Sequence, residues 1–387
     1  MRYNRTTIIF GFLLLLTPLA RQASAFPAFA RKYNLPCARC HTMVPRLTPF
    51  GYAFFRAGFR MPNNQQKSIT LENSMSVVSQ ISVATGQPAF SVPGVDGVFS
   101  SSLSKQLSAL VRYTMATDTG SSSGFDDLFV QYNSRARGPF WSVRVGQIPI
   151  IDGYQLLGDR TFTITDAMMF GGNGPLTGAA QGNFAIGGLE RGVEAGYTDG
   201  GINARVSWLD GVDESGAGNI SLPGNRFNDF VFQAEDLIGN EGTALGGFYY
   251  NGKTPLVSVG YNDNFQRAGL FGTYARDLIA GQRGIPFLHV ELNGGVLWGQ
   301  DTVSLSGAAA NSTGALLEAD LYFQHRTALA IRYDSVLPSN AAGNPVTDAW
   351  TYDLMQRTNS NLQVGFEYRK QRQPNLDTMG VQFLVTY

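Results

Sequence analysis

The chain has 387 residues, with 29 basic and 29 acidic side chains and therefore a formal net charge of zero at pH 7. Glycine occurs 45 times, aromatic residues make up 12% of the chain, and charged residues make up only 15%. Basic residues do not outnumber acidic ones, which argues against nucleic acid as a partner. The rest of the composition favours a long β-protein with many glycines over a helical enzyme.

The first 25 residues show the three parts of a secretory signal peptide. Arg2 and Arg5 provide a basic start, residues 8–16 form an apolar run, and residues 23–25 (Ala-Ser-Ala) provide small side chains for cleavage. The apolar run is much shorter than the roughly 20 residues that a membrane-spanning helix needs, and no later run approaches it. Residues 1–25 are therefore predicted to direct export, and no transmembrane helix is expected.

The two cysteines of the chain belong to one short motif, Cys37-Ala-Arg-Cys40-His41. This is the C-x-x-C-H sequence that attaches c-type haem. Two thiols at this spacing form thioether bonds with the vinyl groups of a porphyrin, and the adjacent histidine coordinates the iron. We therefore predict one covalent haem c, bound by Cys37 and Cys40, with His41 as the proximal axial ligand.

Three other interpretations of this motif are weaker. A thioredoxin-like redox pair would require a surrounding βαβ pattern, which the sequence does not show. A structural zinc site needs four ligands, and the other histidines, His289 and His325, are far away in the sequence. A plain disulfide would leave His41 without a role.

Residues 26–67 are expected to form a short helical cytochrome segment around the haem. This length is close to the limit of about 40 residues below which domains rarely fold without support, so the segment should fold against the rest of the chain, in the lumen of the barrel argued below. Its aromatic side chains are expected to pack against the porphyrin: Phe26, Phe29, Tyr33, Phe50, Tyr52, Phe54, Phe55 and Phe59.

Residues 68–387 repeatedly alternate between apolar and polar side chains, for example over 109–115, 202–208 and 362–369. Period-two alternation predicts strands with one apolar and one wet face, which suits both a soluble β-sandwich and a membrane barrel. Aromatic residues near strand ends and a final alternating strand that closes on Tyr387 favour the outer-membrane barrel. The expected girdle residues are Tyr132, Trp141, Tyr197, Trp208, Tyr249, Tyr250 and Tyr333.

The number of strands follows from these alternating segments. Because bacterial single-chain barrels have even strand numbers, we predict an all-β barrel of about 16 antiparallel strands, with 14 and 18 as alternatives. Eighteen segments are candidates: 70–84, 107–117, 125–133, 140–150, 161–170, 191–198, 202–209, 228–238, 243–250, 256–262, 269–277, 287–298, 302–308, 314–323, 327–335, 347–354, 361–370 and 378–387.

Turn lengths predict the orientation of the barrel. Residues 199–201 (Asp-Gly-Gly) form a tight turn, whereas 209–227 is a long loop rich in Gly, Asp and Asn. Short turns face the periplasm and long loops face outward, so residues 209–227 are expected outside the cell. Residues 251–252 (Asn-Gly) are a hairpin signal that falls on the outer side in this count, and the two indications disagree.

The sixth ligand of the haem iron can be ranked from the sequence. Met43 is too near His41 to reach the opposite face of the porphyrin. Met61 lies 20 residues downstream and is the first candidate, since a thioether raises the reduction potential. His289 is the second, because its strand phase points it into the lumen, whereas His325 is in phase with the lipid-facing residues. An open or water-bound site is equally compatible, and no catalytic residue is predicted.

The order of haem motif, short host segment and barrel resembles the fused outer-membrane cytochrome–porins of iron-oxidising bacteria. The likeness covers Phe26 to Gly58, with Phe-Ala-Arg-Lys-Tyr at 29–33, the C-x-x-C-H motif, and Pro-x-Leu-x-Pro-Phe-Gly at 45–51. The remaining 320 or so residues match in architecture alone. The resemblance implies a monohaem protein of the bacterial outer membrane that oxidises extracellular Fe(II). It would pass the electron to a periplasmic c-type cytochrome or other soluble carrier, as an Fe(II):cytochrome c oxidoreductase.

Two other functions remain compatible with the sequence. One is a diffusion porin whose haem is structural or sensory. The other is a conduit that carries electrons outward to an extracellular acceptor. The reduction potential of the haem separates these possibilities, because an Fe(II) oxidase needs a haem more oxidising than its donor.

Overall fold

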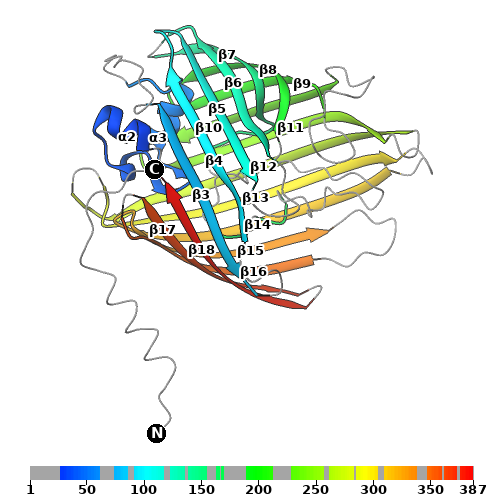
Figure 1. Ribbon diagram of the computed structural model, residues 1–387. Coiled ribbons are helices and arrows are strands. Elements are labelled where there is room, and N and C mark those ends of the chain that lie inside the picture. The colour runs from blue at the N-terminus through cyan, green and yellow to red at the C-terminus, as the bar shows by residue number, and fades with distance from the viewer. Residues whose placement is uncertain are drawn as a thin grey trace.

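The computed structural model describes residues 27–61, 74–85, 91–116, 123–135, 138–154, 163–165, 167–169, 189–211, 228–256, 261–282, 285–303, 309–337, 347–359, 361–372 and 375–386. The signal peptide predicted for residues 1–25 and the predicted boundary near residue 67 lie outside these ranges. The described chain forms a short N-terminal segment and one large barrel (Figure 1).

Sixteen strands of the described chain form one closed antiparallel barrel, in which β18 pairs with β3 to complete the ring. The predicted number of about 16 is confirmed. The strands are β3 (Met75–Ala84), β4 (Ser91–Ser102), β5 (Leu107–Ala116), β6 (Gly124–Asn133), β7 (Phe140–Pro149), β8 (Leu189–Asp199), β9 (Ile202–Leu209), β10 (Asp229–Ile238), β11 (Thr243–Leu256), β12 (Tyr261–Ile279), β13 (Leu288–Val303), β14 (Ala309–Phe323), β15 (Thr327–Leu337), β16 (Thr347–Arg357), β17 (Leu362–Gln371) and β18 (Leu376–Thr386).

The faces of the strands are inverted relative to a soluble protein. In β10, Phe230 and Phe232 are 40% and 44% exposed on the outside, whereas Gln233 and Glu235 are each 3% exposed on the inside. An apolar outer face and a polar interior are what a barrel in lipid requires. This pattern separates the membrane barrel from the soluble sandwich, which period-two alternation alone could not do. Tyr250 differs from the other predicted girdle residues, because it is fully buried and its hydroxyl donates to Glu190.

Several predicted strands differ from the observed ones. Strand β4 was not predicted, since its sequence contains proline and glycine that resemble turn signals. Of the segment 256–262, Leu256 ends β11, residues 261–262 begin β12, and residues 257–260 lie outside the described residues. The segment 269–277 falls within β12, which is 19 residues long. The hairpin expected at 251–252 is wrong. Both residues lie inside β11 and pair with Gln266 and Phe265 of β12.

The candidate strand at 161–170 is also wrong where the structure describes it. Residues 163–165 and 167–169 form no strand, and the backbone N–H of Thr165 donates to Glu367 on β17 at 3.0 Å. Ala167 and Met169 are buried in the hydrophobic core. Part of the β7–β8 connection therefore packs inside the barrel. Its buried apolar residues resemble those of a strand, which is why a strand was predicted, but they do not pair with another strand.

The two ends of the barrel differ in their connections. One end carries short turns, such as residues 200–201 between β8 and β9 and residues 324–326 between β14 and β15. The N-terminal helices and the C-terminus lie together at this end (Figure 1). Short turns face the periplasm in outer-membrane barrels, so this end is assigned to the periplasm. Leu209 and Asp229 flank the predicted outer loop and pair with each other. They lie at the ends of β9 and β10 that are farthest from the short turns.

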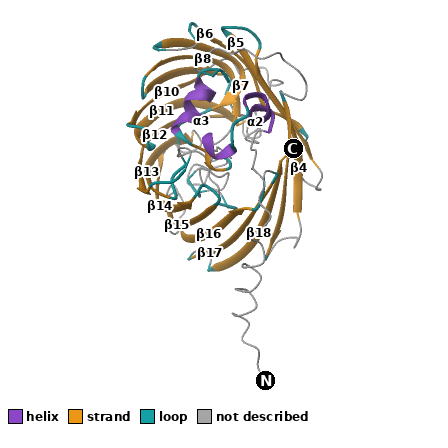
Figure 2. Ribbon diagram, turned by 90° about the vertical axis from the view of Figure 1, so that its left-hand side faces the viewer, coloured by secondary structure: helices purple, strands orange, loops and turns teal. Residues whose placement is uncertain are grey.

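The N-terminal segment contains two helices, a 3-10 turn and a small hairpin: α2 (Pro27–Tyr33), η1 (Cys37–Arg39), β1 (His41–Met43), β2 (Arg46–Leu47) and α3 (Pro49–Arg56). Seen along the barrel, both helices lie within its outline (Figure 2). Thr48 caps α3 by accepting a hydrogen bond from the backbone N–H of Gly51 at 3.1 Å, and Pro49 occupies the first turn. None of the described helices is long and apolar enough to cross a membrane.

Candidate functional site

The C-x-x-C-H motif begins in a 3-10 turn. The backbone N–H of Cys40 donates to the carbonyl of Cys37 at 2.9 Å, which brings the two cysteines to the same side of the chain. No disulfide joins these two cysteines, and Cys37 is only 3% exposed. Burial raises the pKa of the Cys40 thiol to about 12, so this thiol stays protonated at neutral pH.

The sequence Pro-x-Leu-x-Pro-Phe-Gly at residues 45–51 folds back onto the C-x-x-C-H motif. The backbone N–H of Thr48 donates to the carbonyl of Cys40 at 2.9 Å, and its hydroxyl donates to the carbonyl of Arg39 at 2.7 Å. A Cβ atom at Gly51 would lie 2.1 Å from the carbonyl oxygen of Cys40. Only glycine therefore permits the start of α3 to pack against the motif.

His41 is oriented by its own hairpin. Its Nδ1 atom lies 3.3 Å from the carbonyl oxygen of Pro45, and the residue is 5% exposed. A carbonyl can only accept a hydrogen bond, so the proton is assigned to Nδ1 and Nε2 is the nitrogen that suits a metal. Histidine ligands are commonly fixed in this way by a backbone carbonyl.

The barrel wall contacts the motif and the hairpin that follows it at three points. His325, in the β14–β15 turn, places Nδ1 at 3.2 Å from the carbonyl oxygen of Ala38. The side-chain amide of Gln363 on β17 donates to the carbonyl of Val44 at 2.9 Å. The guanidinium of Arg357, at the end of β16, is close enough to Cys37 to interact electrostatically with its thiol. No sequence signal links these residues to a motif that lies about 300 positions earlier.

The two distant histidines have different surroundings. The prediction that His325 follows the lipid-facing phase is wrong, because a turn separates it from β14 and it is 5% exposed inside the barrel. Burial lowers the pKa of His325 to about 4, so its imidazole is neutral. His289 faces the lumen as predicted. Its Nδ1 lies 2.6 Å from Asp277 and its Nε2 lies 3.2 Å from Glu291, so both ring nitrogens are engaged.

The two methionines of the N-terminal segment, Met43 and Met61, pack in different hydrophobic clusters. Met61 is partly buried against a hydrophobic cluster that includes Phe29, Phe54 and Phe59. Its neighbour Arg60 donates to the carbonyl of Ser104 in the β4–β5 turn, well away from the β14–β15 turn that contacts the motif. Met43 is fully buried in another cluster with residues of β14, β15 and β16: Tyr322, Ala328, Ala330 and Met355.

The aromatic residues expected around the porphyrin also lie in two places, one group away from the motif and one residue beside it. Phe29 packs against Phe54 and Phe59 with ring centroids 5.0 Å apart in both pairs. Phe50, by contrast, lies beside the motif, where the guanidinium of Arg39 sits 4.6 Å from its ring centroid. Phe26 lies outside the described residues.

Arg46 anchors the small hairpin to the lumen wall. Its guanidinium is 1% exposed and pairs with Asp320, with Glu318 at 2.7 Å and with Glu291 at 3.5 Å. It also donates to the hydroxyl of Tyr322 at 3.1 Å. Buried carboxylates of two adjacent strands, β13 and β14, therefore converge on one arginine of the N-terminal segment.

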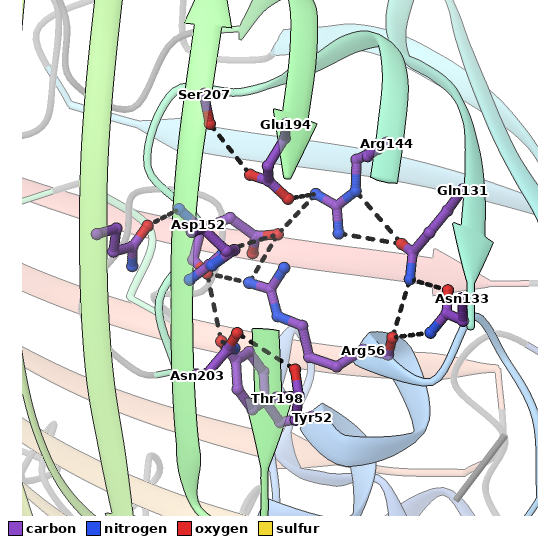
Figure 3. A network of polar contacts seen from close by, with 12 residues as sticks. Tyr52, Arg56, Gln131, Asn133, Arg144, Asp152, Glu194, Thr198, Asn203 and Ser207 are labelled. Carbon is purple, nitrogen blue, oxygen red and sulfur yellow. Dashed lines mark hydrogen bonds and ion pairs between the residues drawn. The ribbon is translucent and has the colours of Figure 1, made fainter. Parts of the chain in front are cut away.

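A second polar network anchors α3 (Figure 3). Arg56 forms an ion pair with Asp152 at 3.0 Å, and its own carbonyl accepts hydrogen bonds from Gln131 and Asn133, both at 2.9 Å. Tyr52 donates to Glu235 on β10. The expectation that the N-terminal segment folds against the barrel is confirmed, since α3 is bonded to strands β6 and β10 and to the segment that follows β7.

These residues fit a covalently attached haem in their chemistry. Two thiols outside any disulfide and an oriented imidazole would supply the attachment and the proximal ligand. Around them, Nε2 of His325 and Nη2 of Arg357 are buried and have no hydrogen-bond partner within the part of the chain that the structure describes. Buried polar atoms without partners are unusual in folded proteins. The lone pair on Nε2 of His325 would suit the haem iron, and the guanidinium of Arg357 would suit a haem carboxylate.

Comparison with known proteins bears on the barrel. The chain matches no protein-family model and no curated protein. Among solved structures, it is similar to an anion-selective porin from Comamonas acidovorans, with a TM-score of 0.54, 15% identity, and coverage of 81% of this chain and 98% of that one. The chain has the fold of an outer-membrane porin.

Two further structures agree with this fold. A loop-deletion mutant of OmpT, an outer membrane protein of Vibrio cholerae, matches with a TM-score of 0.51 and 10% identity over 81% of this chain and 97% of that one. The outer membrane channel DcaP of Acinetobacter baumannii matches with a TM-score of 0.51 and 9% identity over 81% and 96%. The protein is therefore a β-barrel of the bacterial outer membrane, and its apolar outer face contacts lipid.

Proposed function

We propose that this porin-like barrel is an electron-transfer protein that holds one haem c in its lumen. The observation that carries the proposal is the position of the C-x-x-C-H motif at the periplasmic end, where Cys37 and His41 are buried and lumen-facing side chains contact the motif. When bound, haem c supplies a one-electron acceptor and donor. Cys37 and Cys40 would form the thioethers, and His41, held by Pro45, would be the proximal ligand.

The wall beside the motif favours a cationic electron donor. Four buried carboxylates there surround two guanidinium groups, those of Arg46 and Arg332, and Arg357 beside Cys37 adds a third, so acidic groups outnumber basic ones by four to three: Glu291, Glu318, Asp320 and Asp334. An acid-rich lumen raises the local concentration of cations. This supports Fe(II) from outside the cell as the donor. Each Fe(II) would give up one electron and become Fe(III), and a periplasmic c-type cytochrome or other soluble carrier would receive that electron at the short-turn end.

The experiment that tests this function is anaerobic addition of stoichiometric Fe(II) to the purified, oxidised protein while the haem absorption band is recorded. Reduction within the time of manual mixing is expected. Zn(II) is the matched control, because it has the same charge and cannot donate an electron. If dithionite reduces the haem and Fe(II) does not, Fe(II) is not the donor, and a porin with a structural haem or an outward conduit takes its place.

The direction of transfer needs a second measurement. Vesicles that contain the protein with its short-turn end inward would enclose oxidised cytochrome c. We expect Fe(II) added outside to reduce the enclosed cytochrome, and vesicles without the protein to show no reduction. Reduction of the haem without reduction of the enclosed cytochrome would contradict inward transfer.

A further inference from the structure

His325 lies where the barrel wall meets the haem-attachment motif. Gln324 and His325 both have a φ of 50°, a left-handed conformation that is uncommon for residues other than glycine. The backbone N–H of Gln324 donates to the carbonyl of Phe287 at 2.9 Å and helps to hold this turn in place. Together with the buried position of the ring, this turn explains why His325 leaves the lipid-facing phase of β14.

The two ring nitrogens of His325 are in different situations. Nδ1 lies 3.2 Å from the carbonyl oxygen of Ala38, so it is the nitrogen that carries the proton and donates. Nε2 then has its lone pair available, and it is buried without a hydrogen-bond partner among the described residues. A histidine that donates from one nitrogen to a backbone carbonyl and presents the other is arranged as metal-bound histidines are.

We propose that His325 is the second axial ligand of the haem iron, opposite His41. Ala38 lies between Cys37 and Cys40, so the hydrogen bond to its carbonyl holds the imidazole next to the group that these cysteines bind. The inference rests on the proposed function in one respect, since it requires that haem is attached.

The alternatives are less well placed. His289 has a carboxylate on each ring nitrogen. Met61 packs on the aromatic cluster of α2 and α3. Met355 is 1% exposed and belongs to the cluster around Met43, so it is the thioether that competes most directly. Two imidazoles give a lower reduction potential than an imidazole and a thioether. Such a haem suits Fe(II) near neutral pH, where precipitation of Fe(III) makes Fe(II) a stronger reductant.

The test uses the purified full-length protein with its haem. Covalent haem is first measured as the pyridine haemochrome, and the ferric protein is then examined by low-temperature EPR and near-infrared absorption. We expect the wild type to be low-spin without a methionine–iron band. His325→Ala should become mainly high-spin, and added imidazole should restore the low-spin state. Met61→Leu, Met355→Leu and His289→Gln, as matched controls, should keep the wild-type spectrum.

Two results would overturn the inference. The first is a low-spin His325→Ala protein without added imidazole. The second is a methionine–iron band in the wild type that disappears in Met61→Leu or Met355→Leu. If His325→Ala does not fold, the wild type, the methionine variants and His289→Gln still decide: a methionine band, or a high-spin spectrum in the wild type or in His289→Gln, contradicts the inference. Failure of the proposed function looks different, since no covalent haem would then be found in any of the proteins.

Discussion

Replacing Arg46 by glutamine should release the N-terminal segment from the lumen wall. In the native protein the guanidinium neutralises buried carboxylates at 2.7 Å (Glu318) and 3.5 Å (Glu291), and it also pairs with Asp320. Arg46→Gln removes the positive charge and leaves these acids beside a neutral amide. The docked state of the segment should therefore lose stability relative to an open state, while the barrel itself keeps its strand pairing.

The size of the effect follows from the contacts. Removing one partner from a buried ion pair costs about 3–5 kcal/mol. Glu318 keeps Arg332 at 3.7 Å, and the glutamine amide retains part of the hydrogen bonding, so we expect about 2–3 kcal/mol. At 1.4 kcal/mol for each factor of ten, the population of the open state should rise about 30- to 150-fold.

Thiol labelling of haem-free protein measures this opening. In a Cys40→Ala background, Cys37 is the remaining thiol of the chain, and its 3% exposure makes maleimide labelling depend on local opening. The matched control is Arg39→Gln, which removes the same charge from an exposed arginine that stacks on Phe50. The control should accelerate labelling by about fivefold at most. If Arg46→Gln labels no faster than Arg39→Gln, the arginine does not hold the segment in the lumen.

Three further predictions concern the haem, the motif and the lipid face. Acidified acetone should leave the haem on denatured wild-type protein, and haem that leaves with the solvent would contradict covalent attachment. Gly51→Ala should destabilise the docked motif by about 1–3 kcal/mol through overpacking and raise Cys37 labelling about 5- to 140-fold. Gly124→Ala, with no atom within 4 Å of the added Cβ, should not. Leu270→Arg, at a site 58% exposed to lipid, should weaken folding into vesicles by about 2–4 kcal/mol. An equal loss in Leu270→Ala would show that burial of apolar area, and not charge, is responsible.

The sequence alone determined the features that depend on neighbouring residues. Alternation over 202–209 gave the bounds of β9, because side chains of a strand point to opposite faces with a period of two. Eighteen alternating segments, several of them weak, together with the even strand numbers of bacterial barrels then favoured about sixteen strands and left 14 and 18 open. The C-x-x-C-H motif needs only five consecutive residues, so it is fully visible in the sequence, and its haem remains a prediction that the experiments above test.

The tertiary structure decided what depends on contacts between distant residues. Periodicity defines two faces of a strand, but it does not say which face meets lipid, and the buried Gln233 and Glu235 settle that point. It also does not extend through a turn: two left-handed residues carry His325 out of the lipid-facing phase and place it beside Ala38, 287 positions earlier in the chain. The closure of the barrel creates this contact, since only a closed ring of strands encloses the N-terminal segment, and no local pattern records which lumen-facing side chain will touch it.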